Sequence, residues 1–256
     1  AEAIAQCGAA VALLDLRPEA AQTVADRINQ NGGKAIALAA NVLEKASLEA
    51  AHAEVLAKLG PCDILINGAG GNHPKGTTTK ETYEPGDIDK NDLVTFFNLA
   101  PENIQFVFNL NFIGTLLPTQ VFAADMVERK SGTVINISSM NAFRPLTKIP
   151  AYSAAKAAVS NFTQWLAVHF APSGIRVNAI APGFFVTDQN RALLFDAEGN
   201  PTPRTKKILA HTPMNRFGET EDLTGTLLWL VSDKASGFVN GVVVPVDGGF
   251  AAYSGV

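Results

Sequence analysis

A tyrosine and a lysine four positions apart are the side chains of this sequence best suited to move a proton. Tyr152 and Lys156 stand in the run PAYSAAKAAVSNF, and positions i and i+4 of a helix share one face, so the phenol and the ammonium can lie side by side. A phenol with a pKa of about 10 is a poor base at neutral pH, but a neighbouring positive charge stabilises the phenolate. The pair therefore suits general acid–base chemistry, although the spacing alone is also typical of an exposed helix pair.

A serine stands where a strand would deliver it to the same place. Residues 132–138 have the sequence GTVINIS, which is typical of a buried strand, and Ser139 follows it directly. Ligands bind at the carboxyl ends of the strands in open parallel sheets. We therefore expect Ser139 and the Tyr152–Lys156 pair to meet at that edge.

The elements that must position these side chains alternate regularly along the chain. Strands alternating with helices of this length require parallel crossovers, so we predict an α/β fold with a doubly wound parallel sheet in three α/β/α layers. The whole chain, residues 1–256, is expected to form a single domain. The predicted strands are residues 9–16, 34–40, 62–68, 132–138, 175–181 and 241–246, and the predicted helices begin at Pro18 and cover 47–59, 102–129 (bent at Pro118), 151–170 and 221–231, with irregular stretches at 70–101 and 183–218.

Composition excludes several classes of protein. The chain has 256 residues, of which 47% are hydrophobic and 17% charged, so a large core is available. A net charge of −4 argues against nucleic-acid binding. No apolar run reaches the roughly 18 residues of a membrane span, and the first residues lack a secretory pattern. Cys7 and Cys62 form no metal motif, and the four histidines are scattered, so we expect no metal site and a reduced, cytoplasmic enzyme.

Several motifs in order resemble the classical short-chain dehydrogenase/reductase family over essentially the whole chain. They are NGAG (67–70), Asn111, Ser139, YSAAK (152–156), RVNAIAPG (176–183), Thr187, RFGE (216–219) and VDGG (246–249). The resemblance implies a Rossmann-like fold, hydride transfer between a nicotinamide and a carbonyl, and a homotetramer.

The resemblance also implies a role for each expected catalytic residue. Tyr152 is the general acid/base, and Lys156 lowers its pKa and holds the nicotinamide ribose. Ser139 donates a hydrogen bond to the carbonyl oxygen, which stabilises developing charge. Asn111 fixes a water that links Lys156 to solvent, although an asparagine inside a helix can instead bond the backbone.

NAD is the expected cofactor. Asp15 ends a predicted strand, where a carboxylate accepts from the adenosine 2′-hydroxyl and repels a 2′-phosphate. An aspartate there could also cap the following helix, and Arg17 nearby keeps NADP open. The expected cofactor-binding residues are Asp15, Asn41, Val42, Asn67, Gly68, Ala69, Gly70, Tyr152, Lys156, Pro182, Gly183, Phe185 and Thr187.

One expected part of a dinucleotide fold is missing from the sequence. A GxGxxG turn normally follows the first strand and meets the pyrophosphate, but no such turn occurs. Residues 9–16 match the family's second strand, and residues 1–8 match the end of the helix before it. We therefore expect a longer natural protein, and a sheet that lacks a central strand and has two unpaired edges.

Several local stretches resemble bacterial D-mannonate oxidoreductases (fructuronate reductases) of the short-chain type: 70–79, 138–153, 164–170, 182–190 and 247–256. The resemblance implies that D-fructuronate is reduced to D-mannonate. Amide and cationic groups suit a sugar acid, and residues 184–211 are expected to form a lid. The expected substrate residues are Asn72, His73, Lys75, Asn141, Arg144, Lys148, Gln189, Asn190 and Arg191.

Two other interpretations of the sequence stay open. One is a reductase of another sugar, a polyol or a 3-oxoacyl thioester with the same fold. The other is a non-catalytic dinucleotide-binding sensor. A sensor has no need of Tyr152, Lys156 and Ser139 together, so the intact trio argues against it.

Overall fold

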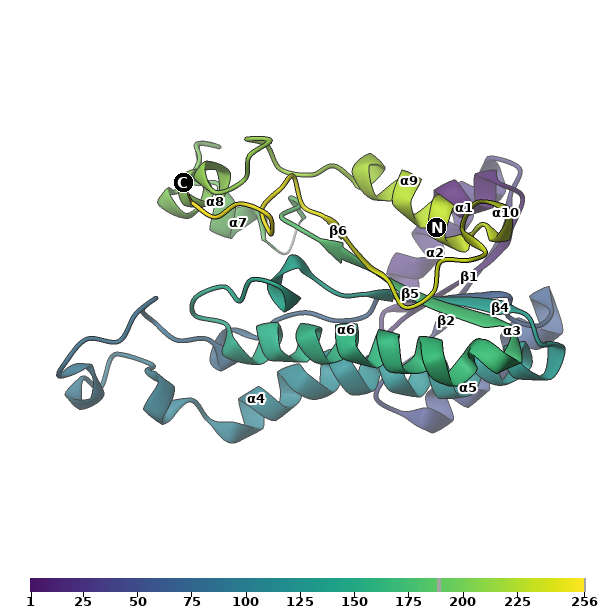
Figure 1. Cartoon of the computed structure of the whole chain (residues 1–256), viewed down its shortest axis with the longest axis horizontal. Coiled ribbons are helices and arrows are strands. Elements are labelled where there is room, and N and C mark those ends of the chain that lie inside the picture. The colour runs from purple at the N-terminus through teal and green to yellow at the C-terminus, as the bar shows by residue number, and fades with distance from the viewer. Residues whose placement is uncertain (188–189, 256) are drawn as a thin grey trace.

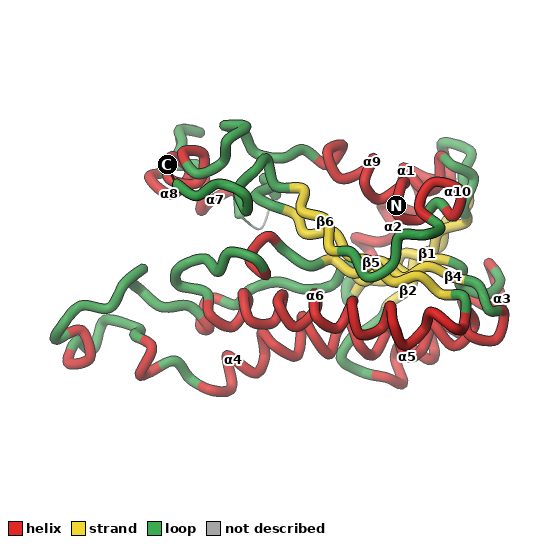
Figure 2. Tube along the Cα trace, in the orientation of Figure 1, coloured by secondary structure: helices red, strands yellow, loops and turns green. Residues whose placement is uncertain are grey.

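A computed structural model describes residues 1–187 and 190–255 of the chain. Parallel strands form the middle layer, and helices cover both faces (Figure 1). Figure 2 shows the strands at the centre and long loops at the end of the molecule opposite α3. The three-layer α/β/α prediction is confirmed.

The described residues form six strands in two parallel sheets. Their bounds are β1 (Ala10–Asp15), β2 (Lys34–Ala39), β3 (Ile64–Asn67), β4 (Gly132–Ile137), β5 (Ile175–Pro182) and β6 (Val243–Val246). One sheet contains β1 and β2, and the other has the order β3-β4-β5-β6. Among the described residues no ladder joins β1 to β3, so the central layer is divided at the position where the sequence predicts unpaired edges.

Helices α3, α4, α5 and α6 cover one face, and α1, α2, α9 and α10 cover the other (Figure 1). Their bounds are α1 (Glu2–Gln6), α2 (Pro18–Gln30), α3 (Lys45–Leu59), α4 (Pro101–Phe108), α5 (Gly114–Arg129), α6 (Pro150–Phe170), α9 (Thr220–Val231) and α10 (Asp233–Ser236). Two short helices, α7 (Arg191–Leu194) and α8 (Pro203–Ala210), lie in the stretch predicted to be irregular. The other predicted strands and helices end within about two residues of their predicted limits, apart from the interruption of residues 102–129.

The long helix predicted at 102–129 is interrupted before Pro118, not at it. A π-helical turn (Asn109–Ile113) separates α4 from α5, and the Gly114 N–H donates to the Asn109 carbonyl. Pro118 lies inside α5, where it cannot donate to the carbonyl four residues back. The widened turn places Asn111, which is fully buried, between the two helices.

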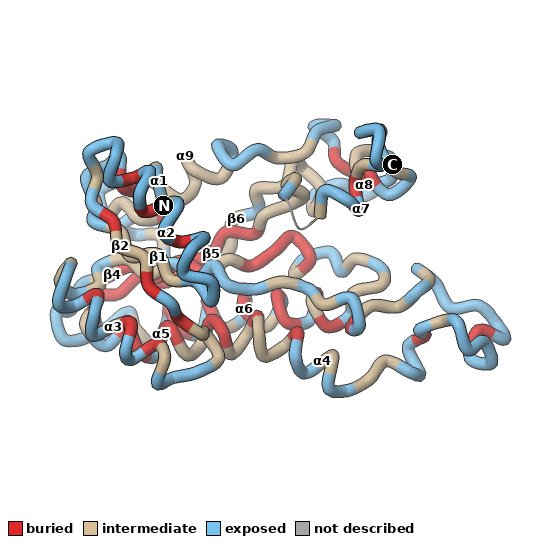
Figure 3. The backbone as a smooth tube through the Cα atoms, turned by 180° about the vertical axis from the view of Figure 1, so that it is seen from behind, coloured by how far each residue is buried: buried red, intermediate tan, exposed pale blue. Residues whose placement is uncertain are grey.

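The core joins both sheets to the helices. Buried residues of β2, α3 and α5 form one cluster with Ala12 of β1 and Leu65 of β3, so this face bridges the divided sheet. Figure 3 shows the buried residues concentrated along β4 and β5 and on the inner sides of the helices. All but the last residue of β5 is buried, as expected for a strand covered on both faces.

The segment Pro101–Arg129 is long and apolar enough, by length and composition, to cross a membrane, with a mean hydropathy of 1.3 over its best window. The prediction from the sequence was based on uninterrupted apolar runs and did not include this segment. In the structure 50% of that window is buried inside the protein. Val107, Phe122 and Met126 are core residues, so the segment packs as a core helix.

Residues 71–100 form an extended loop, which we call the arm, that projects from the body of the molecule (Figure 1). It contains the 3-10 turns η1 (Pro74–Gly76), η2 (Asp87–Asp89) and η3 (Phe96–Asn98). Buried Asp87 organises it by accepting from Lys80 at 2.9 Å and from Lys90 at 3.0 Å. The prediction of an irregular excursion here is confirmed.

Arg176 joins β5 to β4 and α9, and its loss is expected to destabilise the fold. It donates to the Leu230 carbonyl at 3.0 Å, to Thr133 Oγ1 at 3.1 Å and to Asp233 at 2.9 Å. Arg176→Met removes these three hydrogen bonds from a largely buried side chain and should lower the free energy of unfolding by about 2–3 kcal/mol. The melting temperature of the variant should fall by roughly 5–10 °C.

The matched control is Arg27→Met, because the Arg27–Glu2 pair is exposed on α2 and α1. Exposed ion pairs contribute about 0–1 kcal/mol to the free energy of unfolding, so the melting temperature of this variant should be close to that of the wild type. Equal melting of the two variants would contradict the structural role of Arg176.

Candidate active site

Tyr152 and Ser139 meet at the carboxyl end of β4. Ser139 follows that strand, and Tyr152 lies in the first turn of α6, which Pro150 begins. The Asn141 N–H donates to Ser139 Oγ at 3.3 Å. Burial raises the pKa of Tyr152, and a hydrogen bond with the Ser139 side chain opposes that rise. The phenol is therefore protonated at neutral pH and placed to give its proton to an oxygen beside Ser139.

Lys156 lies one turn further along α6. Its ammonium is 5.7 Å from the centroid of the Tyr152 ring and donates to the Ile137 carbonyl at 2.7 Å. Lys156 is 4% exposed, and this burial lowers its pKa to about 8. The lysine is still mostly protonated at neutral pH, so a positive charge stands beside the phenol, as the spacing predicted.

Asn111 is the fourth expected catalytic residue, and backbone hydrogen bonds hold its carboxamide. Its Nδ2 donates to the Gly71 and Val107 carbonyls at 2.8 Å each, and its Oδ1 accepts from the Gly71 N–H at 3.1 Å. The carboxamide is therefore engaged with backbone, which is the alternative role that its helical position allowed. A role in holding a water beside Lys156 stays a prediction.

Gly70 lies where no side chain fits. A Cβ added there would stand 2.6 Å from Asn111 Oδ1 and 3.2 Å from Lys156 Nζ. The glycine expected to line the cofactor is thus required by contacts within the protein. Gly70, Asn111 and Lys156 consequently form one contiguous group.

Gly70→Ala is expected to disturb both the fold and the site. The added methyl must displace the Asn111 carboxamide, and overpacking of this kind costs about 1–3 kcal/mol. We expect a lower melting temperature and roughly a tenfold loss of kcat/KM, since a small displacement of catalytic groups has large kinetic effects. Calorimetry and steady-state assays would measure the two changes.

Gly225→Ala in α9 is the control, because a Cβ added there meets nothing within 4 Å. A Gly70→Ala enzyme as stable and active as this control would contradict the packing assigned to Gly70.

The rim formed by the ends of β1 and β3 fits a bound dinucleotide. Asp15 is exposed at the end of β1, and its Oδ1 accepts from the Arg17 N–H at 2.8 Å, which fixes the carboxylate locally. Gly68, Ala69 and Gly70 are exposed, and a Cβ added at Gly68 meets nothing within 4 Å. An exposed carboxylate at the end of β1 and open backbone at the end of β3 suit the approach of a dinucleotide.

The end of β2 is shaped by local contacts. Asn41 Oδ1 accepts from the Leu43 N–H at 3.0 Å, and Asn41 Nδ2 donates to Glu44 at 2.7 Å. Val42 packs against the start of α5, with its Cγ2 3.0 Å from a Cβ added at Gly114. Asn41 and Val42 therefore build the turn between β2 and α3, next to the rim.

Asn67 points into the protein and not toward the rim. It is 5% exposed, and its Nδ2 donates to Thr119 Oγ1 and Asn136 Oδ1 at 2.9 Å each. Asn136 in turn donates to Thr163 Oγ1 at 2.9 Å. These bonds tie α5, β3, β4 and α6 together, so the Asn67 side chain holds the strand ends in place.

The end of β5 approaches the end of β6 closely. The Gly183 N–H donates to the Val246 carbonyl at 2.9 Å. A Cβ added at Gly183 would lie 2.6 Å from Asp247 Cα, so the turn after Pro182 requires glycine. After this turn, Phe184 and Phe185 line a cavity together with the end of β6.

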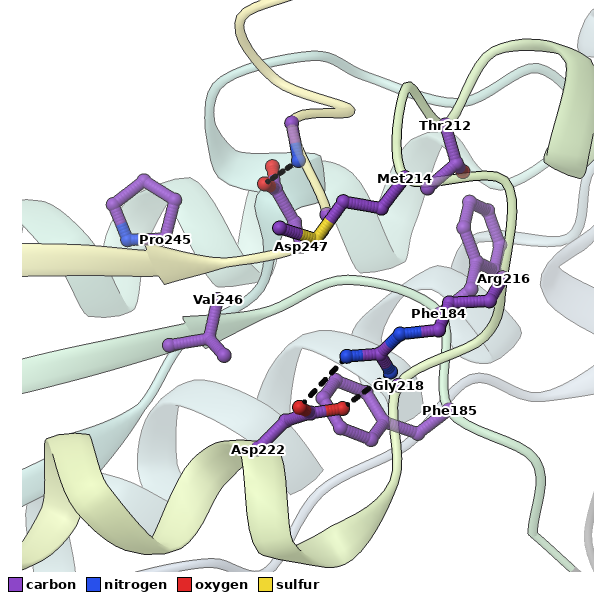
Figure 4. A pocket seen from close by; sticks show the side chains of 12 residues that line it. Phe184, Phe185, Thr212, Met214, Arg216, Gly218, Asp222, Pro245, Val246 and Asp247 are labelled. Carbon is purple, nitrogen blue, oxygen red and sulfur yellow. Dashed lines mark hydrogen bonds and ion pairs between the residues drawn. The ribbon is translucent and has the colours of Figure 1, made fainter.

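A cavity of about 310 Å³ lies beyond this turn (Figure 4). Two of its charged side chains pair, since Arg216 bonds Asp222 at 2.6 Å and 2.9 Å, and Asp247 accepts from the Gly249 and Ala251 N–H groups. Tyr152, Lys156 and Ser139 are not among its walls, so the cavity is not the place of proton transfer. It is lined by Phe184, Phe185, Thr212, Met214, Arg216, Gly218, Asp222, Pro245, Val246, Asp247, Gly248 and Gly249.

Three expected substrate residues lie at the start of the arm. Asn72 Nδ2 donates to Thr77 Oγ1 at 3.1 Å, and His73 Nδ1 accepts from the Lys75 N–H at 3.3 Å. The His73 ring contacts Phe106 of α4 edge-on at 5.2 Å. These contacts fix the arm against α4.

Three more lie between β4 and α6. Asn141 is 5% exposed, and its Oδ1 has no hydrogen-bond partner within the described part of the chain. Arg144 donates to the Ala251 carbonyl at 3.1 Å. Lys148 has a left-handed backbone with φ of 71°. Asn141 is the one that lies directly beside Ser139.

The remaining expected residues lie in the segment that precedes and begins α7. Asn190 Nδ2 donates to the Phe185 carbonyl at 2.8 Å, and its Oδ1 accepts from the Thr187 N–H at 2.8 Å. Asn190 therefore shapes this turn, and Arg191 begins α7. Gln189 lies outside the described residues.

An ion pair that the sequence did not reveal joins α8 to the arm. Lys207 of α8 bonds Glu81 of the arm, although 126 positions separate the two residues. No short-range pattern could have indicated this contact. It makes α8 and the arm neighbours.

Comparison with known proteins identifies the family. Residues 1–197 match the family model described as short chain dehydrogenase. An uncharacterized oxidoreductase from Haemophilus influenzae is 60% identical over 257 residues, which cover 100% of this chain and 89% of that protein. A crystal structure of a candidate D-mannonate oxidoreductase from Haemophilus influenzae with bound NAD has a TM-score of 0.93 and 59% identity, and covers 100% of this chain and 90% of that one.

A more distant structure is that of a gluconate 5-dehydrogenase from Burkholderia cenocepacia in complex with NADP and tartrate. Its TM-score is 0.83 and its identity 31%, covering 99% of this chain and 89% of that one. Both the motifs and the site geometry agree with these matches. The chain belongs to the short chain dehydrogenase family and is an NAD(P)-dependent oxidoreductase with a Rossmann-like fold.

Proposed function

We propose that this enzyme transfers a hydride between NAD and a carbonyl of a sugar acid, with D-fructuronate and D-mannonate as the substrate pair. The convergence of Tyr152, Ser139 and Lys156 at the end of β4 carries the proposal of carbonyl chemistry. The sugar-acid substrate is supported by the names of two similar structures, the candidate D-mannonate oxidoreductase and the gluconate 5-dehydrogenase.

Each of the three side chains has a separate task in reduction. Ser139 donates a hydrogen bond to the substrate carbonyl oxygen, where negative charge develops. Tyr152 gives its proton to that oxygen, which completes the alcohol. The Lys156 ammonium stabilises the phenolate that remains. In the oxidative direction Tyr152 takes the proton from the alcohol, so that direction is favoured at higher pH.

The nicotinamide supplies or accepts the hydride when it is bound. Lys156 and Tyr152 would hold its ribose, and Asp15 would accept from the adenosine ribose at the other end of the rim. Asn41, Val42, Gly68, Ala69, Gly70, Pro182, Gly183, Phe185 and Thr187 complete the proposed set, and the inward-pointing Asn67 side chain supports the strand ends instead. NAD is preferred over NADP in this proposal because the Asp15 carboxylate repels a 2′-phosphate.

A homotetramer in the cytoplasm is part of the proposal. Trp165 and Val168 on α6 are 56% and 78% exposed, and Phe238 is fully exposed. Such apolar surface is typical of subunit interfaces. Light scattering of the purified protein would measure the assembly.

A panel of ketones with NADH and NADPH tests the proposal. We expect D-fructuronate to give the highest kcat/KM, with NADH preferred over NADPH. The panel should include a neutral ketose, a polyol and a 3-oxoacyl thioester, the alternatives that the sequence leaves open. A higher kcat/KM for any of these than for every sugar acid would replace the proposed substrate, and NADH binding without any turnover would indicate a sensor.

A further inference from the structure

Three cations, two from α8 and one from the loop before α6, lie near the carboxylate of Glu81 in the arm. Lys207 of α8 pairs with Glu81 of the arm. Thr78 of the arm donates its N–H to the Lys148 carbonyl at 2.9 Å, which holds the arm against the loop before α6. Arg204 lies in the first turn of α8. We call Glu81, Lys148, Arg204 and Lys207 the cation cluster.

The charges of the cluster do not balance. The pKa of Glu81 lies below its usual range, first because of its hydrogen bond and charge interaction with Lys207, and further because Lys148 and Arg204 are near. One carboxylate thus stands among three cations. Because the Lys207 and Glu81 side chains are 60% and 42% exposed, a second anion can reach the cations from solvent.

The cluster is also close to the reacting groups along the chain. Lys148 precedes Tyr152 by four positions and the start of α6 by two. Its left-handed backbone, with φ of 71°, is costly for a residue other than glycine and is typical of positions that surrounding structure holds for function. Figure 1 shows α8 and the arm at the end of the molecule from which α6 begins.

We propose that Lys148, Arg204 and Lys207 form the subsite for the carboxylate of an open-chain keto-aldonate whose carbonyl lies at Tyr152. In the absence of substrate, Glu81 pairs with Lys207. When the substrate binds, its carboxylate replaces Glu81 as the partner of Lys207. This inference rests on the proposed sugar-acid function and adds the residues that select an acid over a neutral sugar. It gives a role to the ion pair that joins α8 to the arm.

Binding without turnover tests the subsite, so that its outcome is separate from that of the substrate panel. Calorimetric titration of the full-length protein with D-gluconate and with D-glucitol compares an aldonate with a neutral polyol of the same length. The wild type should bind gluconate more tightly than glucitol. Lys207→Met and Lys148→Met should each weaken gluconate binding roughly tenfold, as expected for one charge-assisted hydrogen bond. Glu81→Gln should tighten it.

Lys206→Met is the matched control, because Lys206 lies beside Lys207 on α8 but outside the cluster, and it should bind gluconate as the wild type does. Thermal melts of every variant check folding. Wild-type protein that binds gluconate no better than glucitol would overturn the proposal. Unchanged binding in both Lys207→Met and Lys148→Met, or equal weakening in Lys206→Met, would overturn it as well.

Discussion

Replacing Tyr152 with phenylalanine should lower kcat/KM for ketone reduction about a thousandfold, which is within the range expected for losing a general acid. Without the hydroxyl, the oxygen that Ser139 binds loses the proton donor that lies beside it. The ring still fills its place at the start of α6, so the melting temperature should change little. Consumption of NADH with D-fructuronate gives the rate, and fluorescence titration with NADH gives cofactor affinity.

The control for this prediction is Tyr83→Phe, which removes a hydroxyl from an exposed tyrosine of the arm. Its kcat/KM should equal that of the wild type. A Tyr152→Phe enzyme with more than a tenth of wild-type activity would show that another group donates the proton.

Lys156→Met should abolish activity and at the same time stabilise the fold near neutral pH. Burial lowers the pKa of this lysine from 10.5 to about 8, which corresponds to a cost of about 3 kcal/mol for holding the charged form in the folded protein. Removing the ammonium avoids this cost, but it also removes the hydrogen bond to the Ile137 carbonyl, which lowers the free energy of unfolding by about 1–3 kcal/mol. We expect a net gain of about 1 kcal/mol, or a rise of roughly 2–4 °C in melting temperature.

The sign of the pH dependence follows from the same shift. Below pH 8 the lysine is protonated in both folded and unfolded states, so the free-energy cost of burying the charged lysine lowers the stability of the wild type in full. Between pH 8 and 10.5 the unfolded state binds more protons, so wild-type stability rises with pH relative to the variant. The advantage of Lys156→Met should therefore shrink above pH 8.

Thermal melts of both proteins at neutral pH and at alkaline pH measure this difference. Lys45→Met, on the exposed start of α3, is the control and should show no such trend. A Lys156→Met protein that melts below the wild type at neutral pH would mean that the buried charge is compensated in the folded state.

Most of the fold could be predicted from the sequence, because the pattern of apolar residues along the chain indicates which residues are buried. The runs 132–138 and 175–181 are mostly apolar and rich in Val and Ile, and they became the most buried strands, β4 and β5. The spacing of Tyr152 and Lys156 predicted that the two side chains lie side by side, because a helix has a fixed period. Ser139 followed from its place at a strand end.

Other features depend on contacts that no local pattern encodes. The helices α7 and α8 lie in a stretch rich in turn-forming residues, and α8 was found only in the structure. Asn67 belongs to the motif that suggested a cofactor contact, yet its amide bonds Thr119 and Asn136 across the sheet. The Lys207–Glu81 pair likewise arises from the way α8 and the arm come together.

Transfer of deuterium from labelled NADH tests the central claim most directly. The wild-type enzyme, NADH carrying deuterium at the transferable position, and D-fructuronate should give D-mannonate with deuterium on the former carbonyl carbon, as seen by NMR. The Tyr152→Phe enzyme should give almost none in the same time. Unlabelled D-fructuronate recovered with intact NADH, or equal labelling by the variant, would contradict the account.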